Sequence, residues 1–287
     1  MRDAAPVTVV IFRDAHAFLD AATPLLAADP ISTNVIGSVT ERLATDTPVS
    51  DDLWATVVDS EDRVVGAAML NDPWNLFVSR MPTDAAIAIA DRLSDDAIVL
   101  PGVTGERAAT EAFAARWAAC HGMTVTTLVD ERAHRLRTLT PPADVPGAAR
   151  LAAPGDTTTI AAWLHAFREE AMPHDPPEDT AAGAARMIER AELWLWEHDG
   201  RAVSLVGCRR PTCGVSRVGP VYTPPDLRGR GYAGGTTAAA AAGALAAGAT
   251  SVMLYTDLSN PTSNALYARL GFVPDHDAVQ IGFALAA

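Results

Sequence analysis

The sequence predicts an α/β protein with two domains, and its length and its order of elements carry that prediction. The chain has 287 residues, which suggests two domains at roughly 100–200 residues each. Hydrophobic residues make up 49% and charged residues 20%, an ordinary balance for a globular protein. Hydrophobic periodicity indicates the same order in both halves: two helices, three strands, then helix, strand, helix and strand. We therefore expect an internal duplication.

Turn and cap residues predict where the helices and strands of the first half begin and end. Pro30 follows Asp29 and suits a helix start, and Gly122 suits a helix end. A polar turn at residues 60–62 separates two apolar runs and predicts a hairpin. The expected helices are 15–26, 31–43, 83–93 and 106–121, and the expected strands are 53–59, 63–70, 74–79, 97–100 and 123–137.

A proline-rich stretch, TPPADVP at residues 140–146, separates the halves and predicts domains at 1–140 and 147–287. In the second half, Asp199-Gly200 is a strong hairpin signal. Trp194 and Trp196 alternate on one strand, so we expect them to pack on a shared face. The expected helices are 156–170, 181–190, 231–248 and 263–270, and the expected strands are 193–198, 202–209, 214–222, 251–256 and 278–285.

A glycine-rich turn follows the strand expected at 214–222. The segment VGPVYTPPDLRGRGYAGG, residues 218–235, leads into a run of strong helix formers. Glycine removes the side chains that would keep a ligand from the backbone. The N–H groups at a helix N-terminus are unsatisfied and lie in the positive field of the helix dipole. Such a turn binds a pyrophosphate, and Arg228 and Arg230 can add charge-assisted contacts.

Gly229, Gly231 and Gly234 also match the spacing of a dinucleotide-binding fingerprint. Against that interpretation, the preceding strand follows a hairpin, and Asp257 has the wrong spacing for a ribose contact. A P-loop is excluded because no Gly-Lys-Ser/Thr is present. Taken alone, the glycines leave a pyrophosphate site and a loop without a ligand about equally favoured.

A second informative segment, DLSNPTSNALYARLGF, covers residues 257–272 and follows the strand expected at 251–256. Asn260 suits a helix cap or turn. Asn264 and Tyr267 are three residues apart, so they share one face of the helix that follows.

These two segments together resemble the GNAT N-acetyltransferase superfamily. Its acetyl-CoA motif, Arg/Gln-x-x-Gly-x-Gly/Ala between the fourth strand and the third helix, is similar to Arg228, Gly231 and Ala233. Its second signature is an Asn-rich turn and a helix ending in Leu-Gly-Phe, to which Asn260, Asn264, Tyr267 and Leu270-Gly271-Phe272 are similar. The specific part of the resemblance covers residues 193–283, and the element order extends it over the whole chain.

The resemblance implies a tandem-GNAT arrangement in which each domain is a mixed, mostly antiparallel, twisted sheet flanked by helices. Residues 80–84, Arg-Met-Pro-Thr-Asp, stand where the first domain would carry the cofactor motif, and they contain no glycine. The first domain is therefore expected to be a degenerate copy that binds no CoA. The second domain is expected to transfer an acetyl group from acetyl-CoA to a primary amine, of a small molecule, by direct attack on the thioester.

The resemblance also implies the residues that bind the cofactor. Amides of residues 229–234 would hold the pyrophosphate, and residues 221–223 would pair with pantetheine where the fourth and fifth strands splay apart. The expected set is Val221, Tyr222, Thr223, Arg228, Gly229, Arg230, Gly231, Tyr232, Ala233, Gly234, Asn260, Asn264 and Tyr267. An N–H there, with Val221 as the hypothesised donor, would polarise the thioester carbonyl.

Tyr267 is the expected general acid, because a phenol with a pKa near 10 is protonated at neutral pH and can protonate a departing thiolate. The general base is less defined, because the family often uses a Glu on the fourth strand and residues 214–222 contain no acid. The candidates are Glu169, Glu170, His174 and Glu197, with Glu170 taken as the catalytic hypothesis. Acids in the loop 172–179 can also attract a cation.

Net charge and composition limit the classes of partner that we expect. The net charge of −13 disfavours nucleic acid and mildly favours cationic substrates. The start of the chain lacks a signal-peptide pattern, and no apolar run is long enough for a membrane span. We therefore expect a cytoplasmic protein without membrane contact. Its three cysteines lack metal-site spacing, so we expect no metal.

Other functions stay open at this stage. A non-catalytic acyl-CoA sensor or scaffold is the main alternative, favoured slightly by the missing strand acid. A nucleotide-dependent oxidoreductase rests on Gly229, Gly231 and Gly234 alone. A homodimer is a further hypothesis.

Overall fold

The computed structural model describes residues 6–45 and 52–285, which form two compact units. Unit 1 holds the chain up to Ala133, Asp257–Ser259 and the residues from His276 onward; unit 2 holds His134–Thr256 and Asn260–Asp275. The division predicted at residues 140–147 therefore needs correction. The C-terminal strand returns to unit 1 and hydrogen-bonds there, so no single cut in the sequence separates the two units.

Unit 1 is built on a mixed sheet with the strand order β1-β2-β3-β4-β5-β12-β6. The pair β4–β5 is parallel, whereas β1–β2, β2–β3, β3–β4 and β5–β12 are antiparallel. Its elements are β1 (Thr8–Phe12), α1 (Ala15–Ala28), α2 (Asn34–Thr45), β2 (Leu53–Val58), β3 (Val64–Leu70), β4 (Leu76–Val78), α3 (Thr83–Asp95), β5 (Gly102–Glu106), α4 (Arg107–His121), most of β6 (Met123–Leu136) and most of β12 (Phe272–Leu285).

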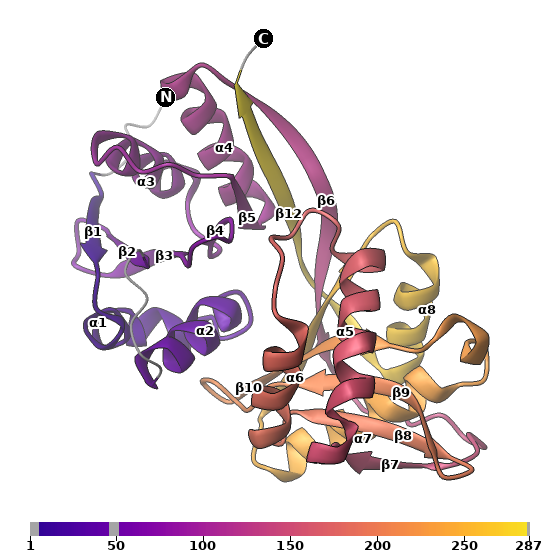
Figure 1. The fold of residues 1–287 in the computed structure, drawn as a ribbon. Coiled ribbons are helices and arrows are strands. Elements are labelled where there is room, and N and C mark those ends of the chain that lie inside the picture. Colours follow the sequence, from indigo (N-terminus) through magenta and orange to yellow (C-terminus); the bar gives the residue numbers. More distant parts are fainter. Residues whose placement is uncertain (1–5, 46–51, 286–287) are drawn as a thin grey trace. The chain divides into compact units, whose positions relative to one another are not determined.

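Helices cover both faces of this sheet because successive strand residues point to opposite sides. Leu53 and Ala55 of β2 pack with α3 and α4 in one buried cluster. Trp54, between them, packs with Phe18 of α1 in another. Figure 1 shows α3 and α4 on one side of the strands and α1 and α2 on the other.

Unit 2 has the strand order β11-β10-β9-β8-β7, with β10–β11 parallel and the other pairs antiparallel. Its elements are β7 (Ala148–Leu151), the short turn η1 (Pro154–Asp156), α5 (Thr157–Ala171), α6 (Thr180–Glu189), β8 (Leu193–His198), β9 (Arg201–Cys208), β10 (Val215–Tyr222), the turn η2 (Pro225–Leu227), α7 (Tyr232–Ala246), β11 (Ser251–Asp257) and α8 (Pro261–Leu270).

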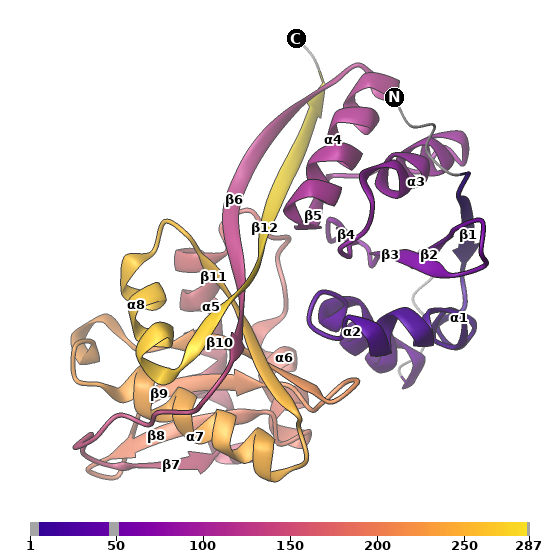
Figure 2. The ribbon, with the colours of Figure 1, turned by 180° about the vertical axis from the view of Figure 1, so that it is seen from behind.

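Close packing of α7 on this sheet depends on its glycines. A Cβ at Gly243 would lie 2.5 Å from the Trp194 ring, and one at Gly235 would lie 2.8 Å from the Trp196 ring. The two indoles thus face one helix, which confirms their predicted shared face. The helices α5 and α6 cover the opposite side of β8 and β9, as a comparison of Figure 1 with Figure 2 shows.

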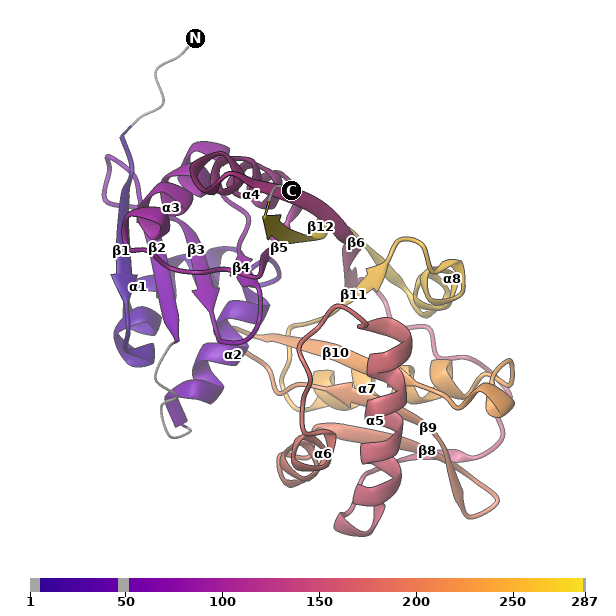
Figure 3. The same cartoon turned by 45° about the horizontal axis from the view of Figure 1, so that its top comes forward.

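The predicted fold class, a mixed and mostly antiparallel sheet flanked by helices, is confirmed in both units (Figure 3). Two short first strands, β1 and β7, were not predicted. The strand predicted at 97–100 is wrong. Instead, the N–H groups of Ala97 and Ile98 bond back to Ser94 and Leu93 and close α3, so β5 starts only at Gly102.

Candidate functional site

The strands β10 and β11 pair only at their beginnings. Their parallel register runs from Val215↔Ser251 to Arg217↔Met253, although β10 continues to Tyr222 and β11 to Asp257. Beyond Arg217, the β11-facing side of β10 has no strand partner in the described register. Peptide N–H and C=O groups therefore remain available there for a ligand. The resemblance implies a splayed gap at this place, and the binding of a cofactor in it stays a prediction.

A bulge on β10 begins where the strands diverge. Val218 pairs with Cys208 and Val221 with Val206, so two residues of β10 oppose one residue of β9. The opposing residue is Gly207, where a Cβ would lie 2.5 Å from the Gly219 carbonyl oxygen. Only glycine allows this close approach, which keeps the bulge packed against β9 as β10 turns away from β11.

The turn before α7 exposes unpaired amides. Gly229 and Gly231 have φ values of 78° and 85°, a region that favours glycine. The first helical hydrogen bond runs from Gly235 N to Gly231 O at 3.0 Å. The amides of residues 232–234 therefore have no acceptor within the helix. A Cβ at Gly229 would meet no atom within 4 Å, so this side of the turn is open. These features fit an anion such as a pyrophosphate.

The two arginines of the turn already have partners. Arg228 Nε donates to the Thr223 carbonyl at 2.8 Å, and its Nη2 lies 2.6 Å from Glu170 Oε2. Arg230 donates to the Asp226 carbonyl at 3.2 Å. Each guanidinium has five N–H donors and keeps some of them outside these contacts. The phosphate contacts predicted for both side chains therefore stay a prediction, beside the unpaired backbone amides of the turn.

Glu170 is the acid that the structure brings to the cofactor motif. It comes from the last turn of α5, and besides Arg228 it accepts a hydrogen bond from the Tyr222 hydroxyl at 3.5 Å. Burial, reinforced by the Glu170 carboxylate, raises the pKa of Tyr222. The Trp163 ring of α5 lies 6.3 Å from the Tyr222 ring. Two aromatic faces and a carboxylate thus converge at the end of β10.

The other predicted acids are engaged elsewhere. Glu197 pairs with Arg150 at 2.6 Å, and Glu169 lies 3.5 Å from His165. In the acidic loop, Glu178 pairs with Arg168 at 3.1 Å, while Asp179 caps α6 through the Ala181 amide at 3.0 Å. The cation-attracting role predicted for this loop is therefore reduced, because two of its carboxylates have local partners.

Tyr267 is almost buried in unit 2, at 7% exposure. Its ring makes an edge contact with Phe272, with centroids 6.0 Å apart. Burial raises its pKa, so the phenol stays protonated, as a general acid must.

The two asparagines of this segment have structural contacts. Asn260 Oδ1 accepts from Ser263 N at 3.1 Å, and Asn264 Nδ2 donates to the Asn260 carbonyl at 2.8 Å. They cap α8, and their predicted contact with the cofactor stays a prediction.

A pair of hydroxyls near the site was not predicted. Ser204 Oγ of β9 lies 2.9 Å from Thr223 Oγ1, at the end of β10, and both residues are buried. Ser204 also donates to the Tyr222 carbonyl at 3.2 Å. The sequence signal was a polar residue inside the apolar run of β9. The roles of Trp163 and of the Tyr222 hydroxyl were not predicted either. Trp163 lies on α5 and Tyr222 on β10, and these two elements come together only in the folded chain.

Among the described residues, no group of three or more His, Cys, Asp or Glu side chains is arranged to hold a metal ion. Within the same residues, no helix has both the length and the apolar character needed to cross a bilayer.

Comparison with known proteins identifies the class of this site. Residues 159–272 match the model of the acetyltransferase (GNAT) family, a range that contains the diverging strands, the glycine turn and Tyr267. The chain therefore contains a GNAT acetyltransferase domain. No curated protein matches the sequence.

Solved structures extend the likeness over nearly the whole chain. A GCN5-related N-acetyltransferase from Sphaerobacter thermophilus is 18% identical, with a TM-score of 0.60, covering 98% of this chain and 97% of its own. A GNAT-family acetyltransferase from Colwellia psychrerythraea is 17% identical, with a TM-score of 0.59, covering 96% and 100%. A tandem GNAT protein from the clavulanic acid biosynthesis pathway is 14% identical, with a TM-score of 0.57, covering 97% and 98%. At these identities the likeness shows the fold, which is GNAT-like in both halves.

Proposed function

We propose that the protein is an acetyl-CoA-dependent N-acetyltransferase that acylates a primary amine of a small molecule. The observation that carries this proposal is the joint presence of diverging strands β10 and β11 and a glycine turn with unpaired amides at the N-terminus of α7. The strands offer peptide groups to an extended amide chain, and the turn offers donors to a pyrophosphate. Pantetheine and the diphosphate of CoA present these two chemistries.

Acetyl-CoA, when bound, supplies the activated acetyl thioester. Residues of the chain would bind the cofactor, polarise the thioester and transfer protons. Amides of residues 229–234 bind the diphosphate, and the Val221 N–H polarises the thioester carbonyl. Glu170 would accept a proton from the arriving ammonium, directly or through water, so that the neutral amine can attack the thioester. As the carbon–nitrogen bond forms and the carbon–sulfur bond breaks, Tyr267 would protonate the thiolate, and the second proton lost by the nitrogen would restore the phenol.

The cluster at the end of β10 favours a cationic acceptor. Glu170 supplies a carboxylate, and Tyr222 and Trp163 supply aromatic faces, which attract cations. The net charge of −13 acts in the same direction at long range. The cytoplasmic location and the homodimer remain hypotheses.

An acyl-CoA sensor without turnover is the second candidate. It is favoured by the absence of an acid from β10 and by the ion pair that holds Glu170 on Arg228.

Two measurements on the full chain test the proposal. Isothermal titration should show acetyl-CoA binding at micromolar protein, and thiol release should appear with members of a small-amine panel. CoA binding with no thiol release across the panel would select the sensor. Absence of CoA binding would refute both candidates.

A further inference from the structure

A cavity of about 300 Å³ lies within unit 1, where the loop that follows α3 meets the last turn of α4. Leu100, Trp117 and Met123 supply apolar walls, and Val99 is 83% exposed beside it. The cavity is at the C-terminal ends of α3 and α4, whereas the turn that would correspond to a cofactor site precedes α3. It is therefore separate from the chemistry proposed for unit 2.

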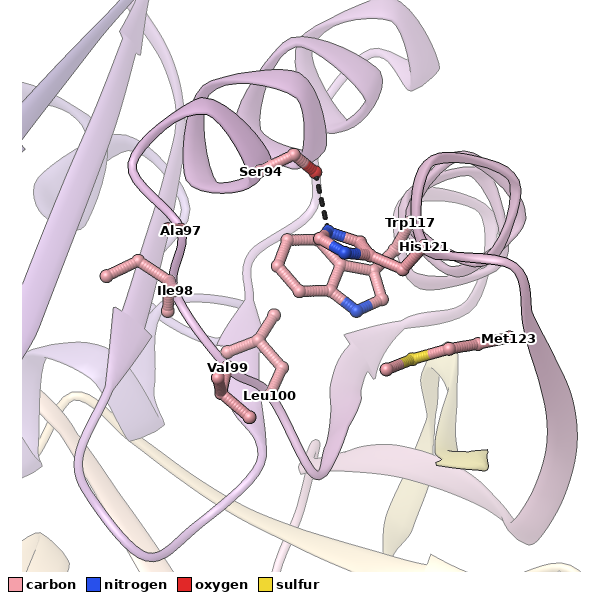
Figure 4. Close-up of a pocket in the computed structure, with 8 residues that line it drawn as sticks. All are labelled: Ser94, Ala97, Ile98, Val99, Leu100, Trp117, His121 and Met123. Carbon is pink, nitrogen blue, oxygen red and sulfur yellow. Dashed lines mark hydrogen bonds between the residues drawn. The ribbon is translucent and has the colours of Figure 1, made fainter. Parts of the chain in front are cut away.

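Trp117 places an unused hydrogen-bond donor at this cavity. Its side chain is 1% exposed and stacks on Phe113 and Phe283 at centroid distances of 5.8 and 6.2 Å. The indole Nε1 is buried and has no hydrogen-bond partner among the described residues. Figure 4 shows this nitrogen on the ring edge that faces Leu100 and Met123. Buried donors in native proteins are nearly always paired, so an unpaired one requires an explanation.

Ser94 and His121, the neighbouring polar side chains, hydrogen-bond to each other, and neither is a partner of the indole N–H. Ser94 Oγ lies 2.8 Å from the Ala90 carbonyl and 3.0 Å from His121 Nε2. A carbonyl only accepts, so the single hydroxyl proton goes to Ala90 and the imidazole must donate its Nε2–H to Ser94. The His121 ring lies 4.2 Å from the Trp117 ring, and in this tautomer its Nδ1 is an acceptor. The indole N–H remains the unpaired donor of the cavity.

We propose that this cavity binds an uncharged, mainly apolar small molecule of bicyclic size that carries one hydrogen-bond acceptor. Its volume of about 300 Å³ is about twice that of a dry cavity that accepts benzene. The acceptor, a carbonyl or ether oxygen, takes the Trp117 N–H. An uncharged ligand is favoured because most of the lining side chains are apolar. Such a site makes unit 1 a ligand-binding domain, independent of the acyl-transfer site.

The test uses two probes of matched shape, 1-tetralone and tetralin, which differ in one carbonyl oxygen. Proton–nitrogen spectra of the full chain report the indole N–H signals, and the Trp117 signal is assigned by its loss in Trp117→Phe. We expect 1-tetralone to shift this signal downfield in a saturable way. We expect tetralin to shift it little. The control variant Trp194→Phe, in unit 2, should leave the response unchanged.

A double-mutant cycle completes the test. Trp117→Phe should reduce the preference for the ketone over the hydrocarbon about fivefold, the value expected for one hydrogen bond. No saturable shift at the solubility limit would overturn the site, and an unchanged preference in Trp117→Phe would overturn the assigned donor. If that variant does not fold, the other five Trp→Phe variants assign the signal by elimination. The ketone-specific shift in the wild-type chain then decides the outcome. None of these readouts depends on CoA.

Discussion

The turn before α7 in unit 2 and the turn before α3 in unit 1 hold the same place in the order of elements, but their backbones differ. Before α7, Gly229 and Gly231 adopt positive φ and leave a series of amides unpaired. Before α3, residues 80–82 contain no glycine, and the Arg80 amide donates to Ser32 Oγ at 2.9 Å. Met81 is buried at 7% exposure. One turn is open to a ligand, and the other is closed by the Ser32 hydroxyl and by its own buried Met81 side chain.

The strands next to these turns differ in the same way. β4 has three residues, and all three pair with β5, from Leu76↔Val103 to Val78↔Gly105. In unit 2, β10 extends well beyond its last pair with β11. One topology can therefore hold a site or lack one. What decides is whether backbone donors and strand edges are left unpaired.

The largest effect is expected from Gly231→Val, which would remove the open turn. A β-branched residue at a φ of 85° is strained, and a Cβ there would lie 3.1 Å from Val145. Losing two charge-assisted hydrogen bonds of roughly 2 kcal/mol each weakens acetyl-CoA binding about 1,000-fold. Isothermal titration measures this. Gly248→Val is the matched control, because its φ of 98° carries similar strain at the other end of α7.

Tyr267→Phe should lower kcat about 100-fold and leave the acetyl-CoA Kd nearly unchanged, because it removes only the proton donor. Because burial raises the pKa of Tyr267, the phenol keeps its proton in alkaline buffer. As the pH is raised to about 10, the wild-type rate should therefore show no decrease caused by deprotonation of Tyr267. Tyr255→Phe on β11 is the control. A kcat within threefold of wild type in Tyr267→Phe would remove Tyr267 from the mechanism.

Glu170→Gln should lower kcat/KM for the amine about tenfold, because it removes the carboxylate that meets the ammonium. It should change acetyl-CoA affinity by less than about fivefold, since the half-exposed pair with Arg228 contributes little. Glu169→Gln, one residue earlier and paired only with His165, should change neither value. Equal losses in both variants would point to a general charge effect and against a specific role.

The smallest effect is expected in the closed turn. Ser32→Ala leaves the Arg80 amide without its acceptor and should destabilise the protein by about 1 kcal/mol, or a few degrees in Tm. Calorimetry measures this, with the exposed Thr23→Ala on α1 as control. Acetyl-CoA should still bind with a stoichiometry of one per chain. Binding of a second equivalent would show that the two turns are more alike than their hydrogen bonds suggest.

Much of the fold could be read from local patterns. The αL turn at Asp199-Gly200, with φ of 49° and 70°, follows from a dipeptide preference. The helix ends at Gly122 and Gly271 follow in the same way. The prediction of a strand at 97–100 was wrong because the same short apolar run can form a strand or a segment that closes a helix. Only the backbone bonds of Ala97 and Ile98 distinguish the two.

The cofactor side of the candidate site was largely predictable, and the acceptor side was not. The turn at Gly229 and Gly231 is local, since its conformation depends on residues adjacent in sequence. The meeting of Glu170 with Tyr222 and Arg228 joins residues more than 50 positions apart, and no periodicity specifies it. The same is true of the unpaired indole of Trp117, whose surroundings exist only after α3 and α4 pack.

Most helices and strands, their repeated order and the backbone conformation of the glycine turn follow from neighbours along the chain, whereas β1, β7 and the segment at 97–100 do not. Three features required the packed structure: the last strand belongs to unit 1, Glu170 pairs with Arg228, and the turn before α3 is closed. These outcomes depend on which distant surfaces pack together. That choice follows from the sum of many burial and pairing energies, and no single motif encodes it.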